Sequence, residues 1–219
     1  MAGLDGPRFG AQPGRARQLV VVLHGLGADG QDLIQLAPDW AKALPEAAFI
    51  APDAPHACDM APYGRQWFSL QDRTPAVMAV GAAQAATALG TLIEAELARF
   101  ALPPEALALA GFSQGAMIAL QLGLRRRPTP ACILAYSGAL LGLDVLAAEL
   151  AGKPPVLLVH GEVDDIVPVA ASRMAEAALR AAGVPVEALY RPTLPHAIDP
   201  AGIEAGARTL ARAFGMTAG

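Results

Sequence analysis

The sequence predicts an α/β fold with a mostly parallel central sheet and helices on both faces. Short apolar runs, too short for typical helices, alternate with longer helix-like stretches, and this alternation favours parallel strands joined by crossovers. The expected strands are residues 19–23, 47–51, 106–110, 131–135, 156–159 and 186–190. The expected helices are residues 75–100, 114–124, 143–150, 169–182 and 201–214.

The composition indicates one compact domain over residues 1–219, with its core at about 19–214. A chain of 219 residues that is 54% hydrophobic and 16% charged can bury one large core. The formal net charge of −4 gives no electrostatic reason to expect nucleic acid or an anionic membrane as a partner. The cluster Arg125–Arg127 follows an expected helix. We interpret these positive charges as interacting favourably with the C-terminal end of the helix dipole.

The cysteine content and the first residues predict a cytoplasmic protein. Two cysteines are too few for a disulfide framework, so a reducing compartment is the simplest inference. Residues 1–10 lack the apolar stretch of a signal peptide.

The charge-free span 75–93 is long enough to cross a membrane, but we interpret it as a buried helix. Alanine is its most frequent residue, and it includes glycine, glutamine and threonine, so no integral membrane segment is predicted. Its continuation places four apolar residues on one face, namely Leu89, Leu92, Ile93 and Leu97. Three charged residues are expected off that face, namely Glu94, Glu96 and Arg99.

Ser113 is the predicted nucleophile. It lies between a strand-like run and a helix-like run, in Gly111-Phe112-Ser113-Gln114-Gly115. A serine on so sharp a turn needs an unusual backbone conformation, and the residues two before and two after it come too close together to carry side chains. Of the four serines, only Ser113 has glycine at both positions.

A serine hydroxyl needs a base, and all four histidines could lie at the carboxyl edge of the sheet. His24 and His160 each close an apolar strand and precede glycine, and we favour a structural role for them as hydrogen-bond partners of neighbouring loops. His56 lies in a proline-rich loop. His196 follows the last expected strand and is favoured if the chain order is nucleophile, acid, base.

The acid should lie between Ser113 and His196, just past a strand end. The segment 160–168 offers three carboxylates, and the sequence physics does not separate Asp164 from Asp165. Asp144 and Glu149 are weaker candidates, because they lie in or next to an expected helix where a solvated face is the ordinary explanation.

Acyl transfer also needs hydrogen-bond donors for the charge that develops on the carbonyl oxygen. The backbone N–H of Gln114 stands at a helix N-terminus, and the glycine-rich segment 24–30 can turn further N–H groups toward the site. This loop has neither phosphate-binding glycine motif, so nucleotide binding is disfavoured. We expect no cofactor and no metal, since Asp29 and Asp32 fit a turn and a helix cap better than ligands.

Residues 53–74 are expected to form a loop over the site. Trp67 is a candidate substrate-binding residue, with anchoring of the loop by Trp67 and Phe68 as an equally good alternative. The apolar side chains of this loop also make a homodimer possible.

Over nearly its whole length the chain resembles the carboxylesterase/phospholipase family of α/β-hydrolases, which includes bacterial carboxylesterases and acyl-protein thioesterases. The matching segments, in order, are residues 23–30, 52–55, 67–68, 111–116, 137–138, 160–164, 167–168 and His196. The resemblance implies a triad of Ser113, Asp164 rather than Asp165, and His196. It also implies an oxyanion hole formed by the N–H groups of Leu26 and Gln114.

One position departs from the family. Pro195 stands where members often have glycine before the catalytic histidine, and it fixes the local backbone and removes an N–H.

The expected activity is that of a serine carboxylesterase on small-molecule esters with short to medium acyl chains, through an acyl-enzyme on Ser113. A lysophospholipase or an acyl-protein thioesterase would keep the mechanism and change the substrate. A noncatalytic binding protein with the hydrolase fold is the alternative from another class.

Overall fold

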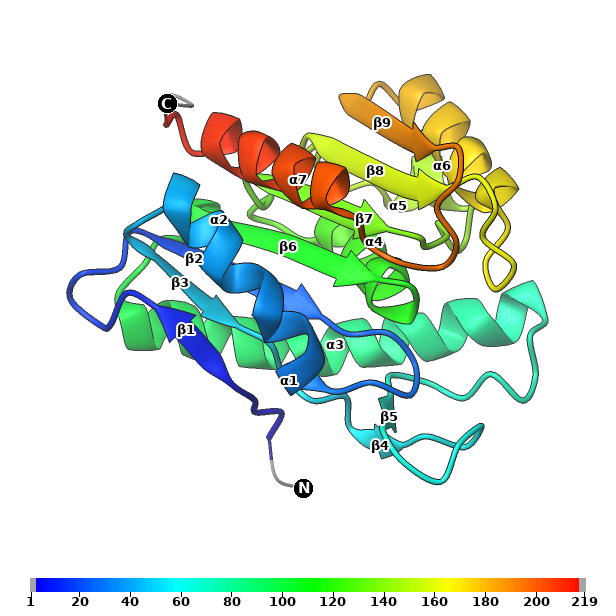
Figure 1. Ribbon diagram of the computed structural model, residues 1–219, viewed down its shortest axis with the longest axis horizontal. Helices are drawn as coiled ribbons and strands as arrows, with labels where there is room; N and C mark the ends of the chain where they lie inside the picture. The colour runs from blue at the N-terminus through cyan, green and yellow to red at the C-terminus, as the bar shows by residue number, and fades with distance from the viewer. Residues whose placement is uncertain (1–2, 217–219) are drawn as a thin grey trace.

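The computed structural model describes residues 3–216, which form a seven-stranded sheet (Figure 1). In spatial order the strands are β1 (Arg8–Gly10), β3 (Ala47–Ile50), β2 (Gln18–Leu23), β6 (Leu107–Phe112), β7 (Cys132–Tyr136), β8 (Val156–Gly161) and β9 (Val186–Arg191). β1 pairs antiparallel with β3, and the other neighbours pair parallel. The expected mostly parallel sheet is confirmed.

Helices cover both faces of the sheet. The α-helices are α1 (Gly30–Leu33), α2 (Ala37–Ala43), α3 (Pro75–Phe100), α4 (Gln114–Arg125), α5 (Leu146–Glu149), α6 (Val169–Ala181) and α7 (Pro200–Ala213). The two 3₁₀ turns are η1 (Ile34–Leu36) and η2 (Pro104–Ala106). One apolar cluster joins the sheet to α3, α4, α5 and α6, and a second joins it to α1, α2 and α7. In Figure 1, α2 and α7 lie in front of the sheet and α3 runs behind it.

All six expected strands are present, with ends that differ by a residue or two. The structure adds β1, the helices α1 and α2, and the two-residue strands β4 (His56–Ala57) and β5 (Arg65–Gln66). The helix expected over residues 143–150 is much shorter in the structure, where only Leu146–Glu149 (α5) is helical. Asp29, expected in a turn, is instead the N-cap of α1, and Asp32, expected as the cap, stands at N3 and completes the capping box.

Helix α3 is more exposed than the predicted buried helix. By length and composition this helix could cross a membrane. Of its apolar 18-residue window, 28% is buried within the domain. Val77 and Val80 near its N-terminus are exposed at 46% and 59%, whereas the apolar residues of its C-terminal half pack against the sheet. The prediction of burial therefore holds for one face of the helix from Ala82 onward and fails for the first residues of the helix.

Glu96 corrects a second expectation for this helix. It was expected off the buried face, but it is buried at 5% exposure, with Arg8 of β1 donating to Oε1 at 2.7 Å and to Oε2 at 3.2 Å. Arg126, expected to act at a helix C-terminus, is also buried and pairs with Glu94 at 2.6 Å. Both pairs join distant segments, so helical periodicity alone could not reveal them.

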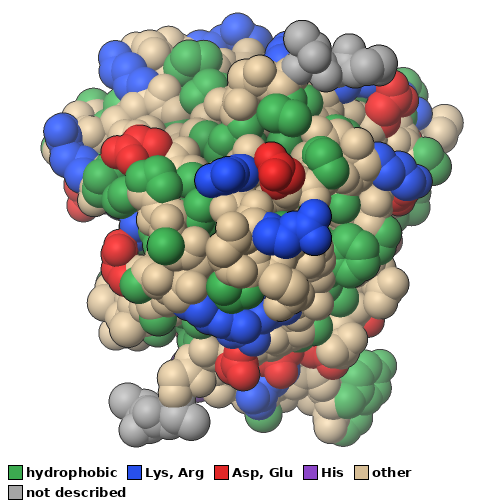
Figure 2. Space-filling model, turned by 90° about the vertical axis from the view of Figure 1, so that its left-hand side faces the viewer, with side chains coloured by type: hydrophobic (Ala, Val, Ile, Leu, Met, Phe, Trp, Pro, Cys, Tyr) green, Lys and Arg blue, Asp and Glu red, His purple; other side chains and the backbone are tan. Residues whose placement is uncertain are grey.

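The two ends of the strands present different surfaces. Figure 2 views the molecule from the side of the strands' amino-terminal ends, where cations and anions are interspersed with apolar side chains and no single sign dominates. The carboxyl ends lie on the opposite side. There β2 and β6 are neighbours, and the chain leaves them toward opposite edges of the sheet, which is the switch point where ligands bind in open α/β sheets.

Candidate active site

Ser113 occupies a strained turn between β6 and α4. Its backbone angles are φ 54° and ψ −117°, a conformation that residues with a side chain rarely adopt. The turn is held because Ser113 N–H donates to Tyr136 O at 2.9 Å. A Cβ on Gly111 would lie 2.3 Å from Gly115 O, and one on Gly115 would lie 2.1 Å from Leu23 O. The predicted need for glycine at both positions is confirmed.

Asp164 and His196 form a hydrogen-bonded pair. His196 Nδ1 lies 2.7 Å from Asp164 Oδ2 and donates to it, while Asp164 Oδ1 accepts the N–H groups of Ile166 at 3.0 Å and Val167 at 2.8 Å. Asp164 is buried, whereas Asp165 is exposed, so the structure brings only Asp164 to His196. Burial alone would raise the pKa of Asp164, but these hydrogen bonds outweigh it and lower the pKa below its ordinary value.

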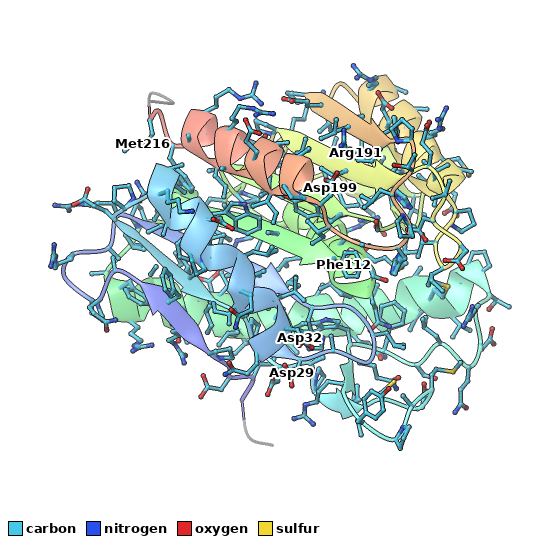
Figure 3. The ribbon with its side chains drawn as sticks, viewed as in Figure 1. Asp29, Asp32, Phe112, Arg191, Asp199 and Met216 are labelled. Carbon is cyan, nitrogen blue, oxygen red and sulfur yellow. The ribbon has the colours of Figure 1, made fainter. Side chains whose placement is uncertain are left out.

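The loop that carries His196 is clamped at its base. Arg191, the last residue of β9, donates from Nε to Asp199 Oδ2 at 2.7 Å, and Figure 3 labels both residues. Asp199 also caps α7 by accepting Gly202 N–H at 2.8 Å. The Phe112 ring lies 4.7 Å from the His196 ring, centroid to centroid. Pro195 is accommodated in this loop, and its carbonyl accepts Ala197 N–H at 2.8 Å.

His24 and His160 are fully buried and hold neighbouring loops, which confirms their structural interpretation. His24 Nε2 accepts Ala54 N–H at 3.0 Å and its Nδ1–H donates to Gly25 O at 2.7 Å. His160 Nε2–H donates to Val167 O at 2.8 Å. Burial lowers the pKa of both imidazoles, so both are neutral near pH 7.

These two histidines should make the fold less stable as the pH falls. Their pKa values are lowered on folding, so below about pH 6.5 the unfolded chain binds protons that the folded chain does not. The free energy of unfolding should therefore fall from pH 7 toward pH 5, by up to about 1.4 kcal/mol per pH unit for each histidine. Urea unfolding across this range measures the slope.

His24→Gln tests the contribution of one histidine, because glutamine can accept the Ala54 N–H and does not titrate. The slope should become shallower in this variant. His56→Gln is the matched control, since His56 is exposed and its replacement should leave the slope as in the wild type. An unchanged slope in folded His24→Gln would contradict the assignment.

A cavity of about 390 Å³ opens at the carboxyl edge of the sheet. Ser113 and His196 both line it, together with Leu26, Gln114 and Phe112. Within residues 3–216, the backbone N–H groups of Leu26 and Gln114 have no hydrogen-bond acceptor. Gln114 N–H stands at the N-terminus of α4, where the helix dipole favours negative charge.

The structure does not support Trp67 as a substrate-binding residue. It is buried at 1% exposure and does not line the cavity. Its Nε1–H donates to His24 O at 2.9 Å, so it anchors the loop, which is the alternative the sequence left open. The Gln114 side chain completes the attachment, accepting Trp67 N–H and donating to Phe68 O, each at 2.8 Å. Sequence reasoning missed this role of Gln114 because it depends on a contact between segments 46 residues apart.

A larger apolar cavity of about 660 Å³ adjoins the first. The two share Arg73, Met78 and Ala139. Its further lining comes mainly from residues 140–145 after β7 and from the start of α3. The apolar run Leu140-Leu141 after Gly138 is the signal that could have indicated it from the sequence.

Within the described residues, no group of three or more His, Cys, Asp or Glu side chains is placed to hold a metal ion. The histidine and carboxylate groups at the sheet edge hydrogen-bond one another and the surrounding backbone instead.

Comparison with known proteins identifies the family. The phospholipase/carboxylesterase family model matches residues 7–211. The chain belongs to the phospholipase/carboxylesterase family. Acyl-protein thioesterase 1 of Neurospora crassa is 28% identical over 81% of this chain and 79% of its own length. Esterase YpfH of Escherichia coli is 29% identical over 84% of this chain and 78% of its own.

A solved structure supports the same placement. Esterase PE8 is 38% identical to this phospholipase/carboxylesterase family member, with a TM-score of 0.91 over 96% of this chain and 99% of that one. The fold is therefore that of the α/β-hydrolases, as the sequence resemblance implied, and the family member is a hydrolytic enzyme.

Proposed function

We propose that this family member is a cofactor-independent serine carboxylesterase with a triad of Ser113, His196 and Asp164. One observation carries the proposal: Ser113, on its strained turn, lines the same cavity as His196, whose Nδ1–H is held by a buried carboxylate. That hydrogen bond leaves Nε2 of His196 free of a proton and able to accept one from a hydroxyl.

The chemistry runs in two halves. Ser113 Oγ attacks the ester carbonyl and passes its proton to His196 Nε2, and the N–H groups of Leu26 and Gln114 stabilise the developing oxyanion. The bond to the alcohol oxygen then breaks, and the alcohol leaves with the proton from His196. Water next gives a proton to His196 and attacks the acyl-enzyme, which releases the acid and restores Ser113.

Labelling by a fluorophosphonate tests the nucleophile without knowledge of the substrate. The probe should react at Ser113 in the folded wild type, located by mass spectrometry of the modified peptide. An unlabelled Ser113 in folded protein would favour a noncatalytic binding role. The intact serine, acid, base and oxyanion donors argue against that role, because binding alone would not need all four.

We propose that the acyl chain is short to medium in length and lies in the two joined apolar cavities. The larger cavity continues away from Ser113 past Ala139, so it can take chain atoms beyond the first few carbons. A thioester or lysophospholipid substrate would use the same apolar space, and the Neurospora crassa relative is named as a thioesterase. Rates for an oxygen ester and a thioester with the same acyl group would separate the two.

Narrowing the junction should change the acyl-length preference. Ala139 lines both cavities and is only half-buried, so leucine at this position should obstruct the passage without filling the core. In Ala139→Leu, kcat/KM for octanoate esters should fall about tenfold, because lost apolar contact of one to two methylenes is worth roughly that factor. Rates should be measured with p-nitrophenyl esters from acetate to dodecanoate.

The acetate ester is the internal control, since its acyl group ends before the junction and its rate should stay near the wild-type value. A uniform loss across all chain lengths, or no loss at any length, would show that the acyl chain does not pass Ala139.

A further inference from the structure

His160 makes contacts beyond those of a buried histidine that only supports a loop. It is the second-to-last residue of β8, close to the acid loop, and its side chain has no exposed surface. Its Nε2 lies 2.8 Å from Val167 O and 3.2 Å from Asp164 Oδ2. Asp164 Oδ2 is the same oxygen that accepts Nδ1–H from His196.

The partners of His160 define its tautomer. Val167 O is a carbonyl oxygen and can only accept, so Nε2 must carry the hydrogen. Nδ1 lies 2.6 Å from Ser172 Oγ on α6, and in the neutral ring it accepts the Ser172 hydroxyl proton. The Ser172 hydroxyl also lies 3.3 Å from Gly138 O, and its shorter contact with Nδ1 fits the tautomer that Val167 O requires.

The His160 ring is connected to both carboxylate oxygens of Asp164, to Oδ1 through Val167 and to Oδ2 directly. The Nε2–H of His160 donates to Val167 O, and Nε2 lies 3.2 Å from Asp164 Oδ2, while Val167 N–H donates to Asp164 Oδ1. His160 thus restrains residue Val167 through its carbonyl group, and the N–H of the same residue holds one carboxylate oxygen. The Nε2 edge of the ring lies beside the other oxygen. Because Asp164 is buried, a group that fixes its carboxylate acts with little screening by water.

We propose that His160 is a positioning residue that orients the Asp164 carboxylate toward His196, with Ser172 holding the Nδ1 side of its ring. The role rests on the proposed function of the Asp164–His196 pair. His160 itself neither touches the substrate nor transfers a proton. His24 shows the contrast: it is equally buried at a strand end, but its ring hydrogen-bonds Ala54 and Gly25 and does not contact the acid.

Two replacements of His160 separate positioning from packing. His160→Leu keeps much of the volume and loses the donor, whereas His160→Gln keeps an N–H donor that can reach the same oxygens. In His160→Leu, kcat should fall by about 10- to 100-fold with KM nearly unchanged, the usual cost of losing a group that orients a catalytic residue. His160→Gln should recover most of that loss.

The pH profile adds a readout that simple packing would not move. Within residues 3–216, the titratable side chains paired with Asp164 are His160 and His196, and α6 contacts His160 through the hydroxyl of Ser172. When Asp164 is poorly oriented, protonated His196 is stabilised less, so in His160→Leu the acid limb of kcat/KM should move to lower pH. His24→Leu is the matched control, and its acid limb should stay in place even if its stability falls.

Ser172→Ala provides a second test of the proposal if His160→Leu does not fold. It leaves His160 in place but removes the hydroxyl that holds Nδ1, so the ring is less well fixed, and it should lower kcat and shift the acid limb in the same direction by a smaller amount. Wild-type kcat and an unmoved acid limb in a folded His160→Leu would overturn the proposal. The same result in Ser172→Ala would overturn it if His160→Leu is unfolded.

Fluorophosphonate labelling of the wild type separates the two levels of inference. An unlabelled wild-type Ser113 would overturn the proposed function. A labelled wild type together with an unaffected His160→Leu would overturn only the role of His160.

Discussion

Replacing Ser113 with alanine should lower ester hydrolysis by about 10⁴-fold or more and leave the protein folded. The large loss is expected because no other hydroxyl stands on the strained turn between β6 and α4, which presents Ser113 to the cavity shared with His196. The measurement is the steady-state rate with a p-nitrophenyl ester, with folding checked by circular dichroism. Retention of most of the activity would remove Ser113 from the mechanism.

Ser113→Gly is the companion variant that measures the strain of the turn. Its activity should be lost as in Ser113→Ala, because both lack the hydroxyl. Alanine keeps a Cβ at φ 54° and ψ −117°, whereas glycine adopts such angles freely. Ser113→Gly should therefore be more stable than Ser113→Ala by about 1–3 kcal/mol in urea unfolding. Equal stability of the two would mean that the turn stores little strain.

The sheet could be predicted because its strands are short apolar runs with turn formers around them. β2 and β8 could be predicted because nearly every residue in them is buried, and strands buried on both faces appear in the sequence as continuous apolar runs. β1 could not be predicted in the same way: its three residues are exposed, and its strand conformation comes from pairing with β3 at the edge. The burial of Glu96 depends on that same unpredicted strand, because Arg8 lies on it.

The candidate site was predictable where local chemistry determines it. The glycines around Ser113 are required by backbone contacts within the turn and with β2, so the pentapeptide alone indicated it. Asp164 and Asp165 are sequence neighbours, and only burial and the direction of the loop separate them. Trp67 and the second cavity depend on how the loop over residues 53–74 meets α3 and α4, which no local pattern encodes.

Replacing Asp164 with asparagine should lower kcat by about 10⁴-fold, through the tautomer of His196 rather than through misfolding. Asp164 Oδ1 accepts two backbone N–H groups, so the amide oxygen of asparagine should take that place. The NH₂ group would then face His196 Nδ1, which must accept instead of donate. His196 would carry its hydrogen on Nε2 and could no longer take the proton of Ser113.

The control lies one residue away. Asp165 is exposed and, within residues 3–216, makes no ion pair, so Asp165→Asn removes the same charge from the same loop without changing the partner of His196. Its kcat should stay within about twofold of the wild type, since surface substitutions seldom matter much. If the two variants lost activity equally, loss of charge in the loop would explain the effect. A large loss in Asp164→Asn alone requires the specific hydrogen bond that His196 Nδ1–H donates to Asp164 Oδ2.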